Sequence, residues 1–416
     1  MPASQPYVSI SQRSRTDGPV LAEPSMASSA AAPLVWLGAK SPGGLALPCA
    51  QPTPSQMYAP RGVWMDDEHF IVCDSGNHRV LIWNGMPVED GQAADIVLGQ
   101  ADFYSEGPAR GQGDFPNGLH LPTGVLVADG KLLIADAWHH RILVWNAVPT
   151  TSQTPPDYAI GQSDLLHVQP NRGVAASADG LYWPYGLAFV AGRLYVTDTG
   201  NRRVLVWSGI PPKDAPAEWV IGQPDFVSTG ENRDGPIAAN SFRWPHAVGG
   251  NEHQLWIADA GNHRVLGWEG PLLLDRPADR VLGQESMSDS REWPYDVQGE
   301  RRLRFPYGLD VQRNCLAVAD TANNRILFWK LPVEQVAFAQ ARDVVGQIDF
   351  AKFGENHWKA VTNQSLCWPY GICIHENHLA VADSGNNRVM IWDCGEIFSA
   401  CDNICETKRS EAQPCA

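Results

Sequence analysis

The sequence predicts an all-β protein, a six-bladed β-propeller of four-stranded antiparallel blades, and three observations lead to this prediction. A segment that runs from a proline to an arginine 19 positions later occurs six times. Successive copies begin 61 to 63 residues apart, and a fixed period of this size indicates an array of one structural unit. Each copy also belongs to a unit with four short apolar runs bounded by turn residues. The copies span residues 60–79, 122–141, 184–203, 245–264, 306–325 and 369–388.

The third unit shows the expected order of strands. A Pro-X-Gly turn leads into an apolar run at 186–189, and an alternating run follows at 194–198. After a loop come the runs 203–207 and 219–223, the last of which ends in Gly-Gln. These runs are rich in branched and aromatic residues, and none keeps the 3.6-residue period of a helix. Four strands per unit in a closed ring leave only short, protected edges, as in a propeller.

The two ends of the repeat array predict how the ring closes. A Gly-Gln element ends each of the first five units, but none follows the sixth copy. Instead, Val35-Trp36-Leu37-Gly38 stands before the first unit. We therefore expect this N-terminal strand to become the outer strand of the last blade. The predicted organisation is a disordered Ser/Ala/Pro-rich leader at 1–33, the propeller at 34–393 and a Cys-rich tail at 394–416.

The repeated element V-x-D-[ST]-G-N-x-R-[VI]-L-x-W, preceded by a Pro-X-Gly turn, resembles the NHL repeat. The resemblance covers about 34–393, and because NHL domains are six-bladed propellers it implies the same fold. These units are longer than the usual NHL repeat. The extra length follows Gly-Gln, as in a bacterial variety whose blades end in GQ-x-D-F.

Composition limits the classes of partner. The net charge of −15 argues against nucleic acid, whose phosphates require a basic face such as some NHL domains carry. No apolar run approaches the ~20 residues of a membrane span. The first 33 residues also lack the apolar core of a signal peptide. We therefore expect a cytoplasmic monomer that binds neither nucleic acid nor a membrane.

The six-fold repetition separates architecture from candidate function. A small-molecule site is needed once, so a residue type kept in every blade is more simply explained by the fold. An aspartate and an arginine five positions later recur in all copies and can close the loop between them through charge-assisted hydrogen bonds. The pairs are Asp74/Arg79, Asp136/Arg141, Asp198/Arg203, Asp259/Arg264, Asp320/Arg325 and Asp383/Arg388.

One face of the propeller is expected to carry the Pro-X-Gly turns, the D-x-G-N-x-R loops and the stretches after Gly-Gln, and we call it the loop face. The middle residues of the turns should ring the mouth of the central channel: Arg61, Thr123, Tyr185, His246, Tyr307 and Tyr370. The residues before the prolines add Trp183, Trp244, Phe305 and Trp368. Such an aromatic concavity suits a small polar or anionic ligand. The alternative is a ring packed on itself.

The second unit departs from the pattern. Trp138-His139 replaces the Gly-Asn of the D-x-G-N-x-R loop, and the glycine is the residue that we expect to supply a positive φ. The loop backbone should therefore differ, with Trp138 exposed. Together with His140, and with His78 and His263 at the same position of their own copies, Trp138 and His139 are candidates for a partner surface. The alternative is a surface loop that happens to carry histidines.

These observations favour a non-enzymatic interaction platform that binds a protein partner or a small ligand on the loop face and at the channel mouth. The first alternative is a lyase or hydrolase at the channel mouth. There, His246, Arg61 and the tyrosines Tyr185, Tyr307 and Tyr370 would serve as acid, base and anion-holding groups. An amidating lyase with an NHL-type propeller places a zinc-ligand histidine after such a proline. A catalytic zinc needs three protein ligands, however, and the other five ring positions offer no histidine.

The second alternative is a metal-handling protein. Cys394, Cys401, Cys405 and Cys415 cluster near the end of the chain, but their spacing matches no zinc signature. No cofactor is predicted, and zinc or calcium stays possible.

Overall fold

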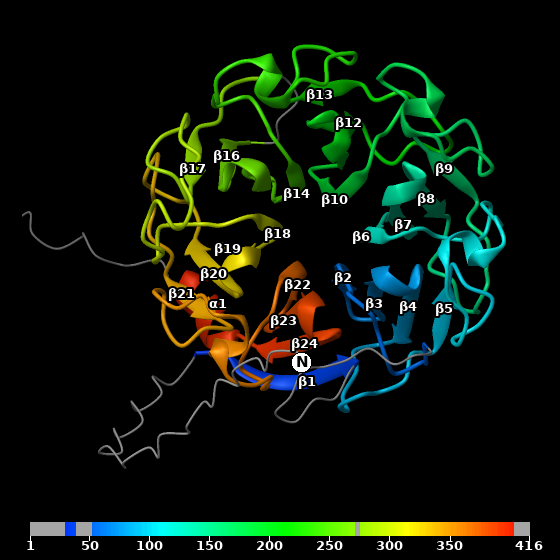
Figure 1. Cartoon of the computed structure of the whole chain (residues 1–416), viewed down its shortest axis with the longest axis horizontal. Helices are drawn as coiled ribbons and strands as arrows, with labels where there is room; N and C mark the ends of the chain where they lie inside the picture. The colour runs from blue at the N-terminus through cyan, green and yellow to red at the C-terminus, as the bar shows by residue number, and fades with distance from the viewer. Residues whose placement is uncertain (1–29, 39–51, 271–274, 403–416) are drawn as a thin grey trace, which may run out of the picture.

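The repeated runs form strands where the sequence predicts them. The computed structural model describes residues 30–38, 52–270 and 275–402. Over these residues, six four-stranded antiparallel sheets stand around a central axis as the blades of a propeller (Figure 1). The predicted fold is confirmed. Most of the predicted leader, residues 1–29, lies outside the described residues.

Five blades run outward from the channel in chain order, and the sixth takes β1 as its outer strand. The first three blades are β2 (Gly62–Met65), β3 (His69–Asp74), β4 (Arg79–Asn84) and β5 (Ile96–Leu98); β6 (Pro122–Ala128), β7 (Lys131–Asp136), β8 (Arg141–Trp145) and β9 (Tyr158–Ile160); and β10 (Pro184–Val190), β11 (Arg193–Asp198), β12 (Arg203–Trp207) and β13 (Trp219–Ile221). The others are β14 (Pro245–Gly250), β15 (Gln254–Asp259), β16 (Arg264–Glu269) and β17 (Arg280–Leu282); β18 (Pro306–Gln312), β19 (Cys315–Asp320), β20 (Arg325–Lys330) and β21 (Asp343–Val345); and β22 (Pro369–His375), β23 (His378–Asp383), β24 (Arg388–Asp393) and β1 (Ala32–Gly38).

The N-terminal strand supplies the outer strand of the last blade. β1 pairs antiparallel with β24, and Leu37 lies opposite Val389. In Figure 1 the blue N-terminal strand lies beside the red strand that ends the last blade. Gly38 has a φ of +101°, close to the +84° of Gly99 in the first Gly-Gln element. The segment therefore takes the place of the missing element, and β1 begins at Ala32, slightly before the predicted start of the propeller at 34.

A short 3₁₀ turn occupies each D-x-G-N-x-R loop. These turns are η1 (Ser75–Asn77), η3 (Ala137–His139), η5 (Thr199–Asn201), η7 (Ala260–Asn262), η8 (Thr321–Asn323) and η10 (Ser384–Asn386). Four more lie in the stretches between blades, namely η2 (Pro108–Gly111), η4 (Pro170–Gly173), η6 (Glu231–Asp234) and η9 (Glu355–Trp358). Gln100 of the first Gly-Gln element donates to the carbonyl oxygens of Asn77 (3.3 Å) and Gly107 (2.9 Å), so the loop and the following stretch lie on one face.

The aspartate and arginine of each copy form a fully buried ion pair. In the third blade, Arg203 Nε donates to Asp198 Oδ2 at 2.7 Å. Asp198 Oδ1 accepts from the backbone N–H of Tyr182 at 2.7 Å. The other guanidinium nitrogens donate to carbonyls in 177–180 and to the carbonyl of Phe226. One pair thus connects its loop to the chain segments on both sides of the blade.

The apolar core lies between blades. Each of the six buried clusters in the described residues combines side chains of two neighbouring blades. Trp207, which follows the arginine of its copy by four positions, is 3% exposed, and its Nε1 donates to the carbonyl of Ala215 at 3.0 Å. The tryptophans therefore fill the space between blades, as the repetition indicates.

The outer strand of a blade is covered by the next blade. The connection between β12 and β13 lies along β9 of the preceding blade, where Tyr158 Oη donates to the carbonyl of Pro211 at 2.6 Å. Directly after this strand, Gly161 N donates to Asp214 Oδ1 at 3.2 Å. A similar connection covers β17, where Val281 N donates to the carbonyl of Val336 at 2.9 Å. An exposed strand edge would otherwise be a template for pairing with another chain.

The beginning of the predicted Cys-rich tail is part of this covering layer. Residues Gly395–Asp402 form α1, which follows β24 and packs against blade five. Phe398 contacts Phe328 with ring centroids 6.3 Å apart, and Arg342 donates to the carbonyl of Ala400 at 2.7 Å. The helix forms because its apolar side faces the blade. Residues 403–416, with Cys405 and Cys415, lie outside the described residues.

No helix within the described ranges has the length and apolar character needed to cross a bilayer.

Ring closure can be tested with two leucines of the same strand. Leu37 is fully buried in β1, whereas Leu34 is 48% exposed. Leu37→Ala should lower the free energy of unfolding by about 2 to 5 kcal/mol, because a buried cavity forms between the blades. Leu34→Ala should change it by less than about 0.5 kcal/mol. Denaturant unfolding of both variants measures the difference. Equal effects would mean that β1 does not pack as a strand of the last blade.

The buried ion pair gives a second test. Asp198→Ala leaves the Arg203 guanidinium buried without its carboxylate, and we expect a loss of about 3 to 5 kcal/mol. The control is Glu269→Ala, because Glu269 pairs with Arg280 at 2.8 Å but is 65% exposed. That substitution should cost less than about 1 kcal/mol. Chemical denaturation of the two variants measures the loss in the free energy of unfolding. A small loss for Asp198→Ala would contradict the structural role assigned to the buried pairs.

Candidate functional site

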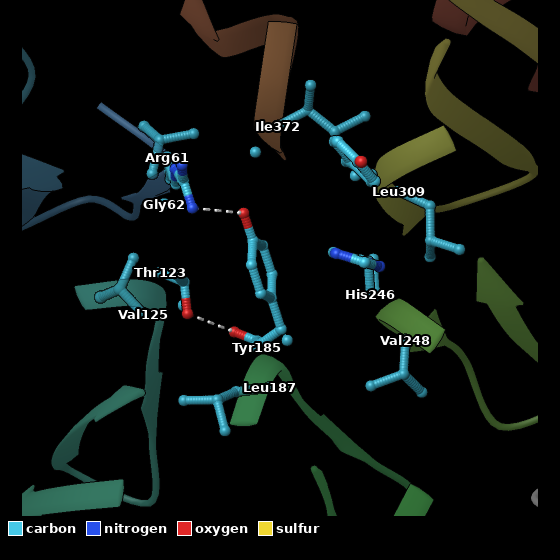
Figure 2. A pocket seen from close by; sticks show the side chains of 17 residues that line it. Arg61, Gly62, Thr123, Val125, Tyr185, Leu187, His246, Val248, Leu309 and Ile372 are labelled. Carbon is cyan, nitrogen blue, oxygen red and sulfur yellow. Dashed lines mark hydrogen bonds between the residues drawn. The ribbon is translucent and has the colours of Figure 1, made fainter. Parts of the chain in front are cut away.

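The middle residues of the Pro-X-Gly turns meet at one end of the central channel. Arg61, Thr123, Tyr185, His246 and Tyr307 line a cavity of about 80 Å³ there. Figure 2 shows Arg61, Thr123, Tyr185 and His246 converging from different blades, with Arg61 and His246 on opposite sides of Tyr185. The predicted ring of turn residues is therefore present in the structure.

The aromatic members of the ring pack on one another. Tyr185, His246, Tyr307 and Tyr370 form a continuous series with successive ring centroids 4.5, 4.4 and 4.9 Å apart. Arg61 closes the series, since its Nη1 donates to Tyr185 Oη at 3.3 Å and its guanidinium lies 5.0 Å from the centre of the Tyr370 ring. The ring thus packs on itself and still encloses a small cavity, and the binding of a ligand there stays a prediction.

Thr123 lies between Arg61 and Tyr185 in the ring and fixes this part of the wall. Its Oγ1 donates to the carbonyl of Tyr185 at 3.2 Å, the second bond drawn in Figure 2. Thr123 and Tyr185 are 3% and 5% exposed, so this part of the wall is held in place by packing.

The mouth carries one positive charge at neutral pH. Burial lowers the pKa of His246 to about 4, and its Nδ1 donates to the carbonyl of Trp244 at 3.0 Å, so the ring is neutral. Burial raises the pKa of Tyr307 to about 12 and raises that of Tyr185 as well. The guanidinium of Arg61 is the charged group of the described cavity wall, which contains no carboxylate.

The tryptophans before the prolines lie outside the cavity wall, although the sequence suggests that they belong to the concavity. Trp183 contacts Trp138, with ring centroids 6.3 Å apart, and Trp368 donates to Glu355 Oε1 at 2.9 Å. Trp244 stacks on Phe305 at 6.4 Å. These side chains therefore contact neighbouring loops and extend the aromatic surface outward over the loop face.

His139 is architectural, and its prediction as a surface residue is wrong. The side chain is 3% exposed, and its Nδ1 bonds Asp136 Oδ2 at 2.8 Å. The asparagine at this position of other copies bonds its aspartate in the same way, for example Asn201 Nδ2 to Asp198 Oδ2 at 2.7 Å. The imidazole thus replaces an amide as the partner of the buried carboxylate.

The expected change in the loop backbone is also absent. η3 forms as in the other blades, because the left-handed residue is not the glycine but the residue two positions later, such as His140 with φ 55°. In the first blade this residue is His78, with φ 54°, and the glycine before it has no left-handed φ. Trp138 can therefore replace the glycine.

The histidines before the arginines connect neighbouring blades. Nδ1 of His78, His140 and His263 accepts a hydrogen bond from the backbone N–H of the residue before the proline of the next copy, at 3.1, 3.1 and 3.3 Å. Asn324 and Asn387 make the same contact through Oδ1 at 2.8 and 2.9 Å. His263 is buried, so it is not part of a partner surface. His78 and His140 are only half-buried, and this contact occupies their Nδ1 atoms.

Trp138 is exposed, as the sequence predicts, and it is not alone. It is 48% exposed and contacts His120, with ring centroids 5.5 Å apart. Almost all large exposed apolar side chains of the described chain lie on the loop face or in the stretches that follow Gly-Gln: Tyr58, Tyr104, Trp138, Leu166, Val174, Tyr182, Val227, Trp293, Tyr295, Val297, Ile348, Trp358 and Trp368. The exceptions are Leu34, Val88 and Val336.

Sequence reasoning missed most of this aromatic surface. Trp293, Tyr295 and Trp358 lie in the long stretches between blades, where their neighbours are mainly polar or turn-forming residues. Aromatic residues in such loops, outside any alternating run, are the sequence signal that could have predicted this exposed surface.

The described residues contain no group of three or more His, Cys, Asp or Glu side chains placed to hold a metal ion. Cys394 and Cys401 are fully buried in the cluster that α1 forms with blade five. Their thiols therefore contribute to packing there, together with Cys315.

Comparisons with known proteins agree with this architecture. NHL repeat-containing protein 2 of Homo sapiens is 22% identical to the chain over 372 residues. The resemblance to the NHL repeat is confirmed. The match covers 82% of this chain and 47% of the human protein, so the NHL-type propeller spans about half the length of the curated relative. No family model matches the chain. The GQ-x-D-F bacterial variety stays a prediction.

Two solved structures illustrate the similarity of the chain to known proteins. Virginiamycin B lyase from Staphylococcus aureus is 12% identical with a TM-score of 0.43, and the match covers 82% of this chain and 97% of the lyase. The WD40 propeller domain of Doa1 is 12% identical with a TM-score of 0.44, covering 87% and 96% of the two chains.

The contacts between blades predict a pH dependence of stability. Burial lowers the pKa of His140 from 6.5 to about 4, so between these values the unfolded chain binds a proton that the folded chain excludes. Stability should therefore fall as the pH falls through this window. His140→Asn keeps an acceptor, as Asn324 does in the fifth copy, and removes the proton site. We expect it to match the wild type near pH 7.5 and to be more stable than the wild type near pH 5.

Urea unfolding at both pH values provides the measurement. The matched control is His253→Asn, because His253 is exposed on a turn. An unchanged pH dependence in His140→Asn would show that the imidazole does not titrate with unfolding.

Proposed function

We propose that this NHL-type propeller is a non-enzymatic interaction platform whose loop face binds a protein partner. The observation that carries the proposal is the concentration of exposed aromatic and aliphatic side chains on that face. Large exposed apolar patches on soluble proteins mark interaction sites, and tryptophan and tyrosine contribute most to binding energy in such sites.

The centre of the proposed surface is an aromatic patch over blades two and three, made of Trp138, Tyr182 and Trp183. The two tryptophan rings meet edge to face at 6.3 Å, and Tyr182 packs on His140 at 5.3 Å. Trp138 and Tyr182 are 48% and 41% exposed. Their contact area therefore faces solvent while their neighbours support them from below.

The backbone of this patch is fixed before any partner binds. Tyr182 N donates to Asp198 Oδ1 at 2.7 Å, and Trp183 N donates to His140 Nδ1 at 3.1 Å. Trp138 N donates to the carbonyl of His120 at 3.2 Å. Rigid anchors lose little conformational entropy on association, which favours binding.

The chemistry of the channel mouth supports binding more than catalysis. The tyrosines there have raised pKa values and stay protonated, and His246, whose pKa burial lowers to about 4, is only a weak base near neutral pH. An acid–base mechanism would need a second titrating group beside it. We further propose a cytoplasmic monomer that binds neither nucleic acid nor a membrane. The net charge of −15 supports the part of this proposal that concerns nucleic acid.

The test uses a partner identified by affinity capture from the source cells and then purified. Trp138→Ala should weaken its binding by about 30-fold, because truncating a central tryptophan in an interface costs about 2 kcal/mol or more. The matched control is Val336→Ala, since Val336 is 63% exposed but lies on the outer rim of the propeller. That variant should bind within about twofold of the wild type. Wild-type affinity in both Trp138→Ala and Trp183→Ala would overturn the proposed surface.

A further inference from the structure

We propose that the channel mouth binds a small hydroxycarboxylate, with Arg61 holding the carboxylate and His246 accepting a hydrogen bond from the hydroxyl. This site is separate from the aromatic patch and does not depend on the proposed protein partner.

The proposal starts from the guanidinium of Arg61, which has no carboxylate partner among the described residues. Elsewhere in the described chain, the fully buried arginines each bond an aspartate at 2.7 to 2.9 Å. Arg61 instead donates to the neutral hydroxyl of Tyr185 at 3.3 Å, and its buried Nε has no partner among the described residues. A largely buried charge is unfavourable unless it is paired. Arg61 therefore lacks the carboxylate partner that the fully buried arginines possess.

The charge and size of the mouth select a monoanion. Arg61 supplies one positive charge, and the described wall adds no second cation. A phosphate dianion would keep an unbalanced charge, whereas a carboxylate matches both the single charge and the planar fork of a guanidinium. The cavity of about 80 Å³ suits a ligand of two or three carbon atoms.

The neutral polar groups of the cavity wall determine how a bound ligand would be oriented. Tyr185 Oη accepts from Arg61, so its proton is available to a ligand oxygen. His246 donates from Nδ1 to the carbonyl of Trp244, which leaves its other ring nitrogen unprotonated. Figure 2 shows a ring nitrogen of His246 directed toward the centre of the mouth, facing Tyr185. The wall therefore offers donors on the Arg61 side and an acceptor on the His246 side. A carboxylate with a hydroxyl on the adjacent carbon satisfies both.

The experiment compares three probes at constant ionic strength with the full chain: glycolate, acetate and the neutral glycolamide. In calorimetric titrations and thermal unfolding, glycolate should bind the wild type most tightly, acetate more weakly and glycolamide not at all. Binding should also raise the unfolding temperature as the probe concentration increases.

Two substitutions separate the roles. Arg61→Gln should weaken glycolate and acetate binding at least tenfold, and without ligand it should be as stable as the wild type or more so, because an unpaired charge is removed. His246→Phe should remove the advantage of glycolate over acetate and keep acetate binding. The matched control is Arg193→Gln, which removes the same charge from the start of β11, outside the mouth. Trp138→Ala should leave glycolate binding unchanged, so this site and the partner surface can fail separately.

The proposal is overturned if glycolate fails to bind the wild type, or if it binds wild type, Arg61→Gln and Arg193→Gln alike. Equal affinity for glycolate and acetate would remove the role assigned to His246.

Discussion

The structure depends on the buried aspartate–arginine pair of each copy. One carboxylate accepts from a guanidinium, from a side chain of its own loop and from the backbone of the preceding segment. The guanidinium then bonds carbonyls on both sides of the blade. A buried ion pair is favourable only when its remaining hydrogen-bonding groups are satisfied, and these contacts satisfy them. Repeated six times, the pair makes the loop face a rigid frame on which other side chains can vary.

Comparison of equivalent positions in the six copies separates substitutions that preserve a structural contact from those that do not. His139 performs the task of an asparagine, and His140 performs that of Asn324, so these substitutions keep the architecture. Trp138 and Arg61 differ from them because neither replaces a contact made elsewhere. Trp138 adds exposed aromatic area, and Arg61 adds a charge whose bonds in the described chain are to neutral groups. Function is therefore best sought where a blade departs from the pattern without restoring a structural bond.

The covering of outer strands completes the same design. The connections that follow β12 and β20 each lie on the outer strand of the preceding blade and form hydrogen bonds with it. After β24, α1 covers blade five in the same way. β1 completes the last sheet from the other end of the array. Strand edges are thereby paired or covered, and the loop face and the channel mouth are the surfaces that we propose for binding.

The sequence by itself determined the number of blades, the four strands in each, the origin of the closing strand and the six residues at the channel mouth. These follow from a period and from alternation, which depend on backbone geometry. It did not reveal that His139 is buried, that α1 covers blade five, or that Trp183, Trp244 and Trp368 lie outside the cavity. Only the tertiary structure decided these points, because burial of a polar or aromatic side chain depends on partners far away in the chain. Arg61 shows the reason most clearly: its hydrogen-bond partner Tyr185 lies 124 positions away.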